Sequence, residues 1–391
     1  MILRTLKTQN FRNLLENPPE FHDGINVLFG DNAAGKTNTL EAIYLFATGK
    51  SFRTRSEKDF IRHGESFARA EIGYENAVLC RTMSVTYMAN GKTALKGMQI
   101  EGAQVDKVSE FLGNFRAVLF TPDHLELVKG APEERRRLID MALCQIQPRF
   151  VKSLNDYMKV LAQRNNYLKS IKFSGKEADF DYLGVLNMQL SKAGAVITKQ
   201  RGLYSEKLSN LAGAAYESLT GGNEGLYAKY ISKAGTSLCD ENEIAENLYT
   251  MYERDTKHDI ELGKTSHGPH HDELMIYVAK KGEGEAFIKE ASQISEENLS
   301  EYAARSFGSQ GQQRSAVLSI KIAEGEIVKE KCGEYPVFLL DDLFSELDDK
   351  RRQKLSEMFL DKQCIITCCD RAALPKRDDM NVINVKDGKY M

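Results

Sequence analysis

The stretch "INVLFGDNAAGKTNTLEAIYLFATG", residues 25–49, decides the fold of this chain. It opens with a short apolar run, residues 25–29, which is typical of a buried strand. After residue 36, apolar side chains recur at helical spacing, at Leu40, Ile43, Tyr44 and Ala47. Between these two patterns lies "GDNAAGKT", residues 30–37, which satisfies the pattern G-x-x-x-x-G-K-[ST]. The order of strand, glycine loop and helix therefore predicts a P-loop.

The chemistry of phosphate binding explains this layout. Glycines let the backbone curl so that successive amide N–H groups point at phosphate, and the following helix directs its positive end there. Lys36 can reach the outer phosphates, and the Thr37 hydroxyl can ligate Mg²⁺. The alternative to a P-loop is an ordinary glycine turn, which would not require a buried strand before it and a helix after it. We expect ATP with Mg²⁺, bound by Gly30, Asp31, Asn32, Ala33, Ala34, Gly35, Lys36 and Thr37.

A second motif supplies the acidic partner that a P-loop ATPase needs. In "YPVFLLDDLFSELD", residues 335–348, a continuous apolar run predicts a strand buried on both faces. Asp341 follows at the carboxyl end of that strand, where ligands bind in open α/β sheets. We expect Asp341 to hold Mg²⁺ through water. Asp342 is expected to orient the attacking water, so that Asp342 and Lys36 are the predicted catalytic residues.

Composition limits the class of protein. The chain has 391 residues, 42% of them hydrophobic and 28% charged, which fits two or three globular domains. No run reaches the roughly 20 apolar residues of a membrane span, and the start lacks the pattern of a signal peptide, so a cytoplasmic location is expected. Seven cysteines show no zinc spacing. The net charge of −3 neither supports nor excludes nucleic-acid binding.

Further motifs resemble those of the RecF family, cytoplasmic ATPases of bacterial DNA replication and repair. They are "NFRN" (10–13), "GDNAAGKTN" (30–38), "GKSFRTRSEKDFIRHG" (49–64), "VLFTPDHLELVKGAPEERRRLID" (118–140), "HGPHHDEL" (267–274), "GSQGQQR" (308–314) and "LLDDLFSELDDKRR" (339–352). The resemblance implies an α/β fold: an ABC/SMC-type P-loop ATPase head (lobe I) and a largely helical second lobe. That second lobe is expected to carry a short antiparallel coiled-coil-like arm.

The resemblance also implies roles for individual residues. Ser309, Gln310, Gly311 and Gln312 resemble the signature that faces the nucleotide of a second subunit, whereas a well-capped helix start is the simpler interpretation. "SELD" resembles the D-loop, which would place Ser345 and Asp348 at a dimer contact beside ATP. Asn10 and Arg12 resemble a loop that reaches phosphates, although an ordinary solvated turn is the alternative.

Two groups of arginines are candidates for DNA contact. Arg53, Arg55 and Arg62 follow the P-loop helix, and Arg135, Arg136 and Arg137 form a run in the "KGAPEERRRLID" element. A solvated charged face is the competing interpretation of both groups. The histidines His267, His270 and His271 lack the partners that tetrahedral metal spacing requires, so we do not predict a metal site there.

Some positions depart from related ATPases. Transporter-type ATPases carry a histidine after the strand that follows the acidic motif, whereas this chain has Thr367, Cys368 and Cys369, so the sensor of the γ-phosphate is not identified. Asp342 stands where many such enzymes have glutamate. Its shorter reach predicts slow, switch-like turnover. We expect a weak ATPase activity that depends on DNA. An acidic stretch near residues 280–303 has the character of an insertion.

The two ATP motifs lie about three hundred residues apart, so the middle of the chain must be an excursion from the head. We expect the head in residues 1–123 plus 300–391 and the helical lobe in residues 124–299, with a helical hairpin at about 150–219. Its first helix has apolar side chains at heptad gaps, at Val151, Leu154, Met158, Leu161 and Leu168. Such a stub is far shorter than the coiled coils of chromosome-organising SMC proteins.

The sequence favours an ATP-dependent DNA-binding protein that dimerises with ATP on duplex DNA near single-strand gaps and is released by slow hydrolysis. The family resemblance further implies the partners RecR and RecO and help in loading RecA. Two alternatives are an ABC-type ATPase subunit of a transporter and an SMC-like structural scaffold that binds ATP.

Overall fold

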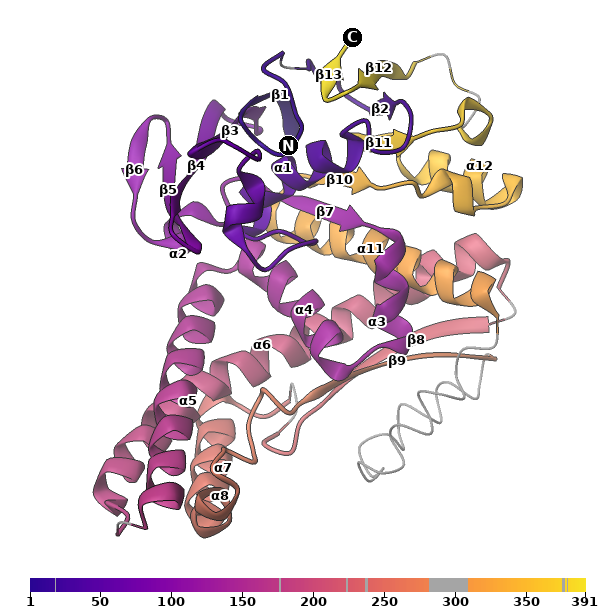
Figure 1. Ribbon diagram of the computed structural model, residues 1–391. Helices are drawn as coiled ribbons and strands as arrows, with labels where there is room; N and C mark the ends of the chain where they lie inside the picture. Colours follow the sequence, from indigo (N-terminus) through magenta and orange to yellow (C-terminus); the bar gives the residue numbers. More distant parts are fainter. Residues whose placement is uncertain are drawn as a thin grey trace. The chain divides into compact units, whose positions relative to one another are not determined.

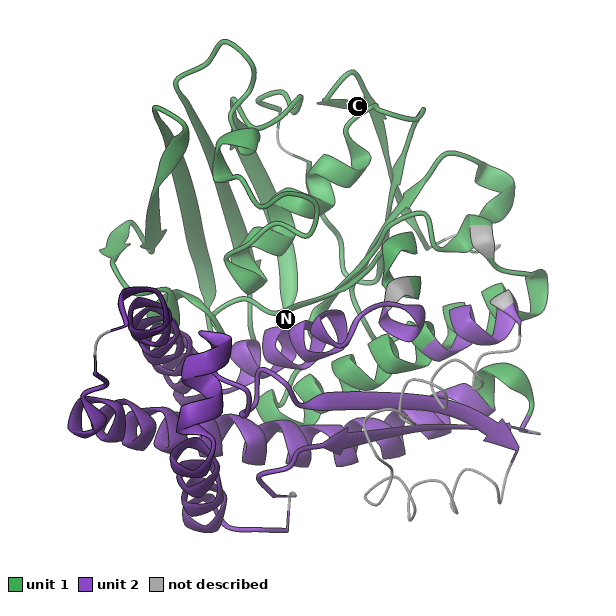
Figure 2. Cartoon of the chain, turned by 60° about the horizontal axis from the view of Figure 1, so that its bottom comes forward, with its two compact units in different colours: residues 1–125, 218–221, 317–391 green, residues 126–217, 222–316 purple. Residues whose placement is uncertain are grey.

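A computed structural model describes residues 1–391 except 18, 176, 223, 236–237, 281–308, 375–376 and 378. The predicted acidic insertion near 280–303 thus lies outside the described residues from residue 281 onward. The chain divides into two compact units (Figure 2). Unit 1 comprises Met1–Leu125, Ser218–Gly221 and Val317–Met391, and unit 2 comprises Glu126–Glu217 and Gly222–Ala316.

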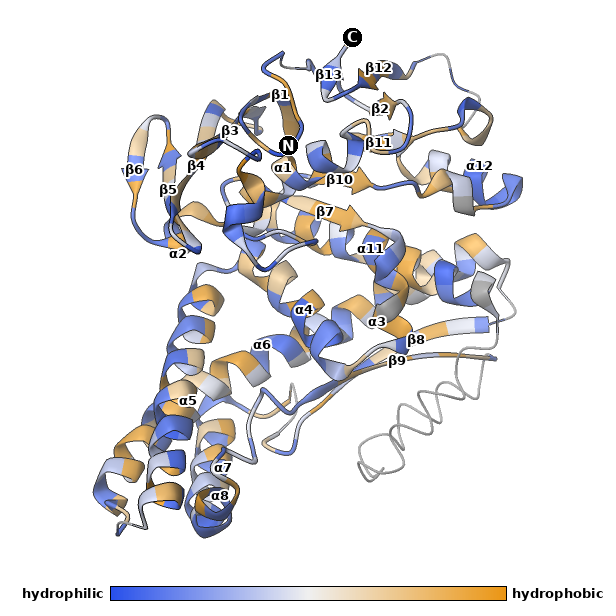
Figure 3. Cartoon of the chain, viewed as in Figure 1, coloured by the Kyte–Doolittle hydropathy of each residue, from blue (hydrophilic) through white to orange (hydrophobic). Residues whose placement is uncertain are grey.

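A six-stranded sheet forms the centre of unit 1, in the order β13-β12-β2-β11-β10-β7 (Figure 1). Its strands are β2 (Ile25–Phe29), β7 (Ala117–Phe120), β10 (Val337–Leu340), β11 (Cys364–Cys368), β12 (Asn381–Lys386) and β13 (Lys389–Tyr390). All are parallel except β13. Strands β7, β10 and β11 are buried along their whole length, as their apolar sequences require (Figure 3).

A second, antiparallel sheet in unit 1 has the order β1-β3-β4-β5-β6. Its strands are β1 (Ile2–Gln9), β3 (Phe67–Glu75), β4 (Cys80–Asn90), β5 (Thr93–Ile100) and β6 (Ala103–Val105). Helix α1 (Lys36–Thr48) contacts strands of both sheets, and every residue from Thr39 to Thr48 is buried. A helix enclosed in this way explains why its sequence is apolar nearly all round.

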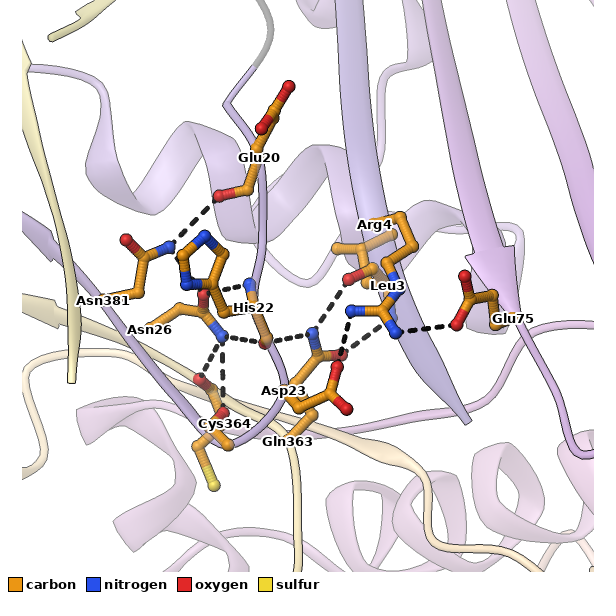
Figure 4. A network of polar contacts seen from close by, with 11 residues as sticks. Leu3, Arg4, Glu20, His22, Asp23, Asn26, Glu75, Gln363, Cys364 and Asn381 are labelled. Atoms are coloured by element: carbon orange, nitrogen blue, oxygen red, sulfur yellow. Dashed lines mark hydrogen bonds and ion pairs between the residues drawn. The ribbon is translucent and has the colours of Figure 1, made fainter. Parts of the chain in front are cut away.

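Hydrogen bonds at the amino ends of the parallel strands join the two sheets of unit 1 (Figure 4). The Gln363 side chain accepts from the Leu3 N–H at 2.7 Å and donates to the Leu3 carbonyl at 2.8 Å. It also donates to the His22 carbonyl at 3.0 Å, and Asn26 bonds that same carbonyl at 2.8 Å. This network fixes the end of the parallel sheet opposite to the carboxyl ends of its strands.

The remaining helices of unit 1 are α2 (Val108–Phe111) and α12 (Asp349–Met358), together with most of α11 (Gln310–Cys332). Unit 2 contains the first residues of α11. It also contains α3 (Glu126–Lys129), α4 (Pro132–Ile146), α5 (Pro148–Ser174), most of α6 (Phe180–Thr220), α7 (Glu241–Arg254) and α8 (Thr256–Leu262). Strands β8 (Glu224–Ile231) and β9 (Glu273–Lys280) pair antiparallel in unit 2.

Helices α5 and α6 form the predicted antiparallel pair. Tyr167 stacks edge-on against Tyr182 at 4.9 Å between ring centroids, and Arg164 donates to Asn187 at 2.8 Å. These contacts run in opposite directions along the two helices. The predicted heptad seam is wrong at Met158, which is 53% exposed. Arg164 is fully buried in the same helix because Asn187, Asp259 and Thr265 satisfy most of its guanidinium.

The edges of the compact units do not coincide everywhere with the predicted domain limits, which stay a prediction. The first turns of α11, Gln310 to Ala316, belong to unit 2, although the sequence grouped them with the head. Helix α11 is continuous across this division, so one element contributes to both units. None of the helices in the described part of the chain combines the length and apolar content needed to cross a membrane.

Candidate nucleotide-binding site

The glycine loop between β2 and α1 adopts a conformation that depends on its small residues. Gly35 caps α1 with a left-handed φ of 113°, and Ala33 is also left-handed at 65°. A Cβ on Gly30 would lie 2.1 Å from the Val385 carbonyl oxygen of β12, so only glycine fits there. The turn after β12 supports the loop from behind, because the Gly388 N–H donates to the Ala34 carbonyl at 2.8 Å.

Lys36 is folded over this loop. Its Nζ donates to the Gly30 carbonyl at 2.6 Å and to the Asp31 carbonyl at 2.8 Å. The ammonium group is thereby held beside the loop amides and the amino end of α1. A cation, a helix amino terminus and glycine amides at one place form an anion-binding arrangement.

The acidic motif reaches the same place across the sheet. The Thr37 hydroxyl donates to Asp341 Oδ1 at 3.0 Å, although the two residues are 304 positions apart. Burial raises the pKa of Asp341 above its ordinary value, the hydroxyls of Thr367 and Thr37 oppose that rise, and the neighbouring Asp342 adds to it. A hydroxyl and a carboxylate that meet in this way are hard oxygen ligands and fit Mg²⁺.

Asp342 occupies a tight turn directly after β10. It has a left-handed φ of 49°, its N–H donates to Thr367 Oγ1 at 2.9 Å, and its carbonyl accepts from Ser345 at 2.8 Å. Of the two predicted D-loop residues, Ser345 therefore braces this turn. Asp348 caps α12 by accepting from the Arg351 N–H at 3.0 Å. Both contacts are local, and the predicted dimer contact stays a prediction.

The N-terminal loop beside the P-loop has other partners than predicted. Arg12 donates through Nε at 3.0 Å and Nη2 at 2.9 Å to Glu41, a fully buried carboxylate of α1. Asn10 donates to Glu65 at 3.2 Å. The guanidinium of Arg12 neutralises Glu41 in this structure, and the expectation that Arg12 reaches phosphate stays a prediction. Asn13 in the same loop contacts the P-loop directly, through the Ala33 carbonyl at 3.2 Å.

The predicted signature lies in unit 2, where it caps α11. The Ser309 N–H donates to the Gln312 side chain at 2.8 Å, and the Gln312 N–H donates to Ser309 Oγ at 3.2 Å. This reciprocal pair is a capping box. Gln312 also donates to Glu224 at 2.7 Å. The capped-helix interpretation is thus correct for the local structure, and the exposed Ser309 keeps the trans role as a proposal.

The candidate DNA contacts divide into two classes. Arg53 and Arg55 are exposed, and Arg53 donates to Asn38 in the first turn of α1 at 2.6 Å. Arg62 instead donates to the carbonyls of Arg12 and Leu14 and holds the N-terminal loop. These backbone bonds give Arg62 a structural role in unit 1, and its predicted DNA contact stays a prediction.

The arginine run of α4 is also mainly structural. Arg135 is buried and paired with Glu273 at 2.9 Å, and it donates to the Gly130 carbonyl at 2.8 Å. Arg136 donates to the Asp272 carbonyl at 2.7 Å. Within this run only Arg137 is exposed, and DNA contact by these arginines stays a prediction.

The "HGPHHDEL" element is the centre of a buried polar network in unit 2. Asp272 accepts from Tyr230 at 2.5 Å and from Thr198 at 3.4 Å. His270 contacts the Tyr157 hydroxyl at 2.5 Å, and His267 pairs with Asp255. The described residues contain no group of three or more His, Cys, Asp or Glu side chains placed to hold a metal ion. The network explains this motif as a structural one.

The sequence interpretation assigned no role to Glu41, the partner of Arg12, or to Thr367, the partner of Asp341. Glu41 gave no signal because a charged residue in a helix is usually exposed. Thr367 gave only a weak one, as the single hydroxyl in the apolar strand β11. Both acquire their roles from partners that are distant in the sequence.

Comparison with known proteins agrees with this geometry. The chain matches the family described as "RecF/RecN/SMC N terminal domain" over residues 2–390. It is 38% identical to the DNA replication and repair protein RecF of Ruminiclostridium cellulolyticum, over 95% of this chain and 93% of that protein. It is 35% identical to the RecF protein of Pediococcus pentosaceus, over 100% of this chain and 99% of that protein.

Solved structures show the same relationship. The recombination mediator protein RecF with ATP, of the RecFOR pathway, superposes with a TM-score of 0.85 at 31% identity, covering 100% of this chain and 97% of that one. An SMC head bound to the C-terminal winged-helix domain of ScpA gives a TM-score of 0.53 at 15% identity, covering 100% and 96%, which shows a shared fold alone. The chain therefore belongs to the RecF family of DNA replication and repair proteins.

Proposed function

We propose that this protein is an ATP-dependent DNA-binding switch of replication and recombinational repair. The observation that carries the proposal is the 3.0 Å contact between Thr37 and Asp341, which joins the P-loop to the end of β10. The relative of 31% identity was solved with ATP, and that supports ATP as the nucleotide. ATP would lie along residues 30–37, with Lys36 and the α1 terminus binding its phosphates.

Mg²⁺ bound with ATP would neutralise phosphate charge and polarise the γ-phosphate. The residues suited to hold it are Thr37 and, through water, Asp341. Asp342 follows directly in a constrained turn, where its carboxylate can accept a proton from the attacking water. Because small errors in reach cost large rate factors, aspartate at this position supports weak, switch-like turnover.

A second copy of the chain would complete the cycle. We infer that the exposed Ser309 and the α11 terminus of one chain cap the nucleotide of another, with Gln310, Gly311 and Gln312 in the same signature. Ser345 and Asp348 would lie at that contact. A helix amino terminus is an anion site, and a second such site has use only if two chains close on two nucleotides.

DNA and protein partners follow from the family. We propose duplex DNA near single-strand gaps as the substrate, RecR and RecO as partners in loading RecA, and a cytoplasmic location. Arg53, Arg55 and Arg137 are the predicted DNA contacts whose side chains are exposed. Residues 1–123 plus 300–391 are proposed as the ATPase head and 124–299 as the helical lobe.

The test measures mass by light scattering together with ATP hydrolysis, with and without gapped duplex DNA. Wild type should be monomeric without nucleotide and dimeric with ATP, and DNA should raise its hydrolysis. Asp342→Asn should lower hydrolysis by about 100-fold or more, because it removes the general base, and should accumulate the dimer.

Ser309→Arg is the matched variant for dimer closure. It should bind ATP as a monomer, because it changes only the signature and leaves the P-loop intact. A Ser309→Arg protein that dimerises with ATP like wild type would refute the trans role. A wild-type chain that stays monomeric with ATP and DNA would refute the switch itself.

A further inference from the structure

We propose that Thr367 is the positioning residue that orients both carboxylates of the nucleotide site, Asp341 and Asp342. The proposal rests on the proposed ATP and Mg²⁺ binding and deepens it. Thr367 stands in the region where transporter-type ATPases carry a histidine, and it belongs to no motif described above. Among the described residues, its hydroxyl is the one side-chain group that bonds to both members of the acidic pair.

The register of the sheet brings Thr367 to this place. Strands β10 and β11 are parallel, and Leu340 pairs with Ile366 at the last position of their ladder. The next residues along the two strands are Asp341 and Thr367, so the two side chains meet just beyond the last pair. On its other side β11 pairs with β2, which leads into the P-loop. Thr367 is therefore held between the strands that carry the two ATP motifs.

One hydroxyl makes two different hydrogen bonds here. Thr367 Oγ1 donates to Asp341 Oδ1 at 2.7 Å and accepts from the Asp342 N–H at 2.9 Å. The first bond shares Oδ1 with the Thr37 hydroxyl, which lies 3.0 Å away. The carboxylate of Asp341 thus accepts one hydrogen bond from Thr37 at the start of α1 and one from Thr367 in β11. Its orientation toward Thr37 depends on both.

The second bond acts on the backbone of the predicted general base. Asp342 has a left-handed φ of 49°, which a residue other than glycine adopts only when its surroundings hold it there. The bond from its N–H to Thr367 supplies part of that support. Thr367 is only 2% exposed, so water cannot easily replace either partner. We infer that loss of the hydroxyl frees both carboxylates at once.

The main test uses Thr367→Val, which keeps the shape of the side chain and removes the hydroxyl. Binding of Mn²⁺, as a spectroscopic substitute for Mg²⁺, is followed by the electron paramagnetic resonance signal of the free ion in protein saturated with ATP. Mn²⁺ affinity should fall by about 10-fold or more, the usual effect of losing a group that orients a metal ligand. ATP affinity measured in EDTA should stay within about twofold, because the P-loop is unchanged.

Three further variants separate positioning from packing. Thr367→Ser keeps the hydroxyl and should restore Mn²⁺ affinity to within about threefold of wild type. Thr367→Ala also lacks the hydroxyl and replaces the valine variant if that protein does not fold. Thr48→Val is the matched control, because Thr48 is a buried threonine of α1 whose hydroxyl donates to the Tyr44 and Lys50 carbonyls and accepts from the Lys50 N–H, all within its own helix end. It should bind Mn²⁺ like wild type.

The outcomes are distinct. A folded Thr367→Val protein with wild-type Mn²⁺ affinity would overturn the inference. An equal loss of ATP affinity in EDTA would also overturn it, since the residue would then support the P-loop in general. Failure of the wild-type chain to bind ATP at all would instead refute the proposed function. Recovery by serine together with a silent Thr48→Val would support the positioning role.

Discussion

Charged side chains in the two units of this molecule serve different purposes. The cluster of unit 1 gathers Lys36, Thr37, Asp341 and Asp342 at the carboxyl ends of parallel strands, and all but Lys36 are partly exposed. The charged side chains Arg164, Arg201 and Asp272 of unit 2 are instead each less than 9% exposed and bonded to other side chains or carbonyls of that unit. Partly exposed charged groups at the carboxyl ends of strands are available to a ligand, whereas enclosed charged groups have their partners within the fold.

The hydrogen-bond partners of Arg201 in unit 2 and of Lys36 in unit 1 illustrate this difference. Arg201 binds Asp140 through two hydrogen bonds of 2.8 Å and donates to the Pro269 carbonyl at 2.6 Å. In the described part of unit 1, the Lys36 ammonium bonds only carbonyls of its own loop, and a phosphate can replace them. Substitutions should therefore reduce stability in unit 2 and ligand binding in unit 1.

The largest effect is expected for Arg201→Met. It leaves the Asp140 carboxylate and the Pro269 carbonyl without their donor, and breaking a buried ion pair in this way costs about 3–5 kcal/mol. Hydrogen exchange in peptides of β8 and β9 should accelerate, while peptides of β10 and β11 should stay protected. Arg149→Met is the control, because that pair with Glu241 is exposed and should be worth less than about 1 kcal/mol. Equal protection of β8 in both variants would contradict the comparison.

The second effect is expected for Lys36→Ala. Loss of the charged donor should weaken ATP binding by about 100-fold, which corresponds to about 2.7 kcal/mol. The free energy of unfolding should change by less than about 1 kcal/mol, since the loop carbonyls can bond water instead. Calorimetric titration with ATP and thermal unfolding without it measure the two quantities. A variant that binds ATP normally but melts early would show that Lys36 is a structural residue.

The smallest effect concerns pH and His270. Burial lowers the pKa of His270 from its ordinary 6.5 to about 3, with the neighbouring His271 adding to the shift. The folded state therefore keeps the ring neutral, and its contribution to stability is lost as pH falls below about 6.5. His270→Gln lacks this titration, so the stability gap between wild type and variant should shrink by about 2 kcal/mol or less from pH 7 to pH 5.

Asp272 must be considered in the same measurement, because burial raises the pKa of this residue whereas it lowers the pKa of His270. Burial raises its pKa to about 6, so the folded state favours the protonated form, and stability from this group is lost as pH rises from about 4 toward about 6. The Asp272 contribution to the free energy of unfolding is present in both wild type and His270→Gln, so it cancels when the two free energies are subtracted. Urea unfolding at several pH values measures the gap, and a gap independent of pH would place the His270 pKa near its ordinary value.

Much of the unit 1 site could be predicted from the sequence. The P-loop is a contiguous pattern, and the apolar run that ends in Asp341 and Asp342 fixes a strand and its exit together. The helical hairpin was also predictable, because the spacing of apolar side chains along each helix can be recognised within one continuous stretch of sequence. Met158 was assigned to the apolar seam incorrectly and the burial of Arg164 was not predicted, since the choice between two adjacent faces of α5 depends on which charges find partners in α6 and α8.

By itself, the sequence determined which local elements form and which carry phosphate chemistry, because strand, glycine loop and capped helix are encoded within some ten to twenty neighbouring residues. Only the tertiary structure decided which charged side chains remain available. Arg12, Arg62 and Arg135 have the same chemistry as Arg53, but carboxylates or backbone carbonyls of the fold accept hydrogen bonds from them. Such pairing depends on residues far apart in the chain, and the cost of burying an unpaired charge enforces it.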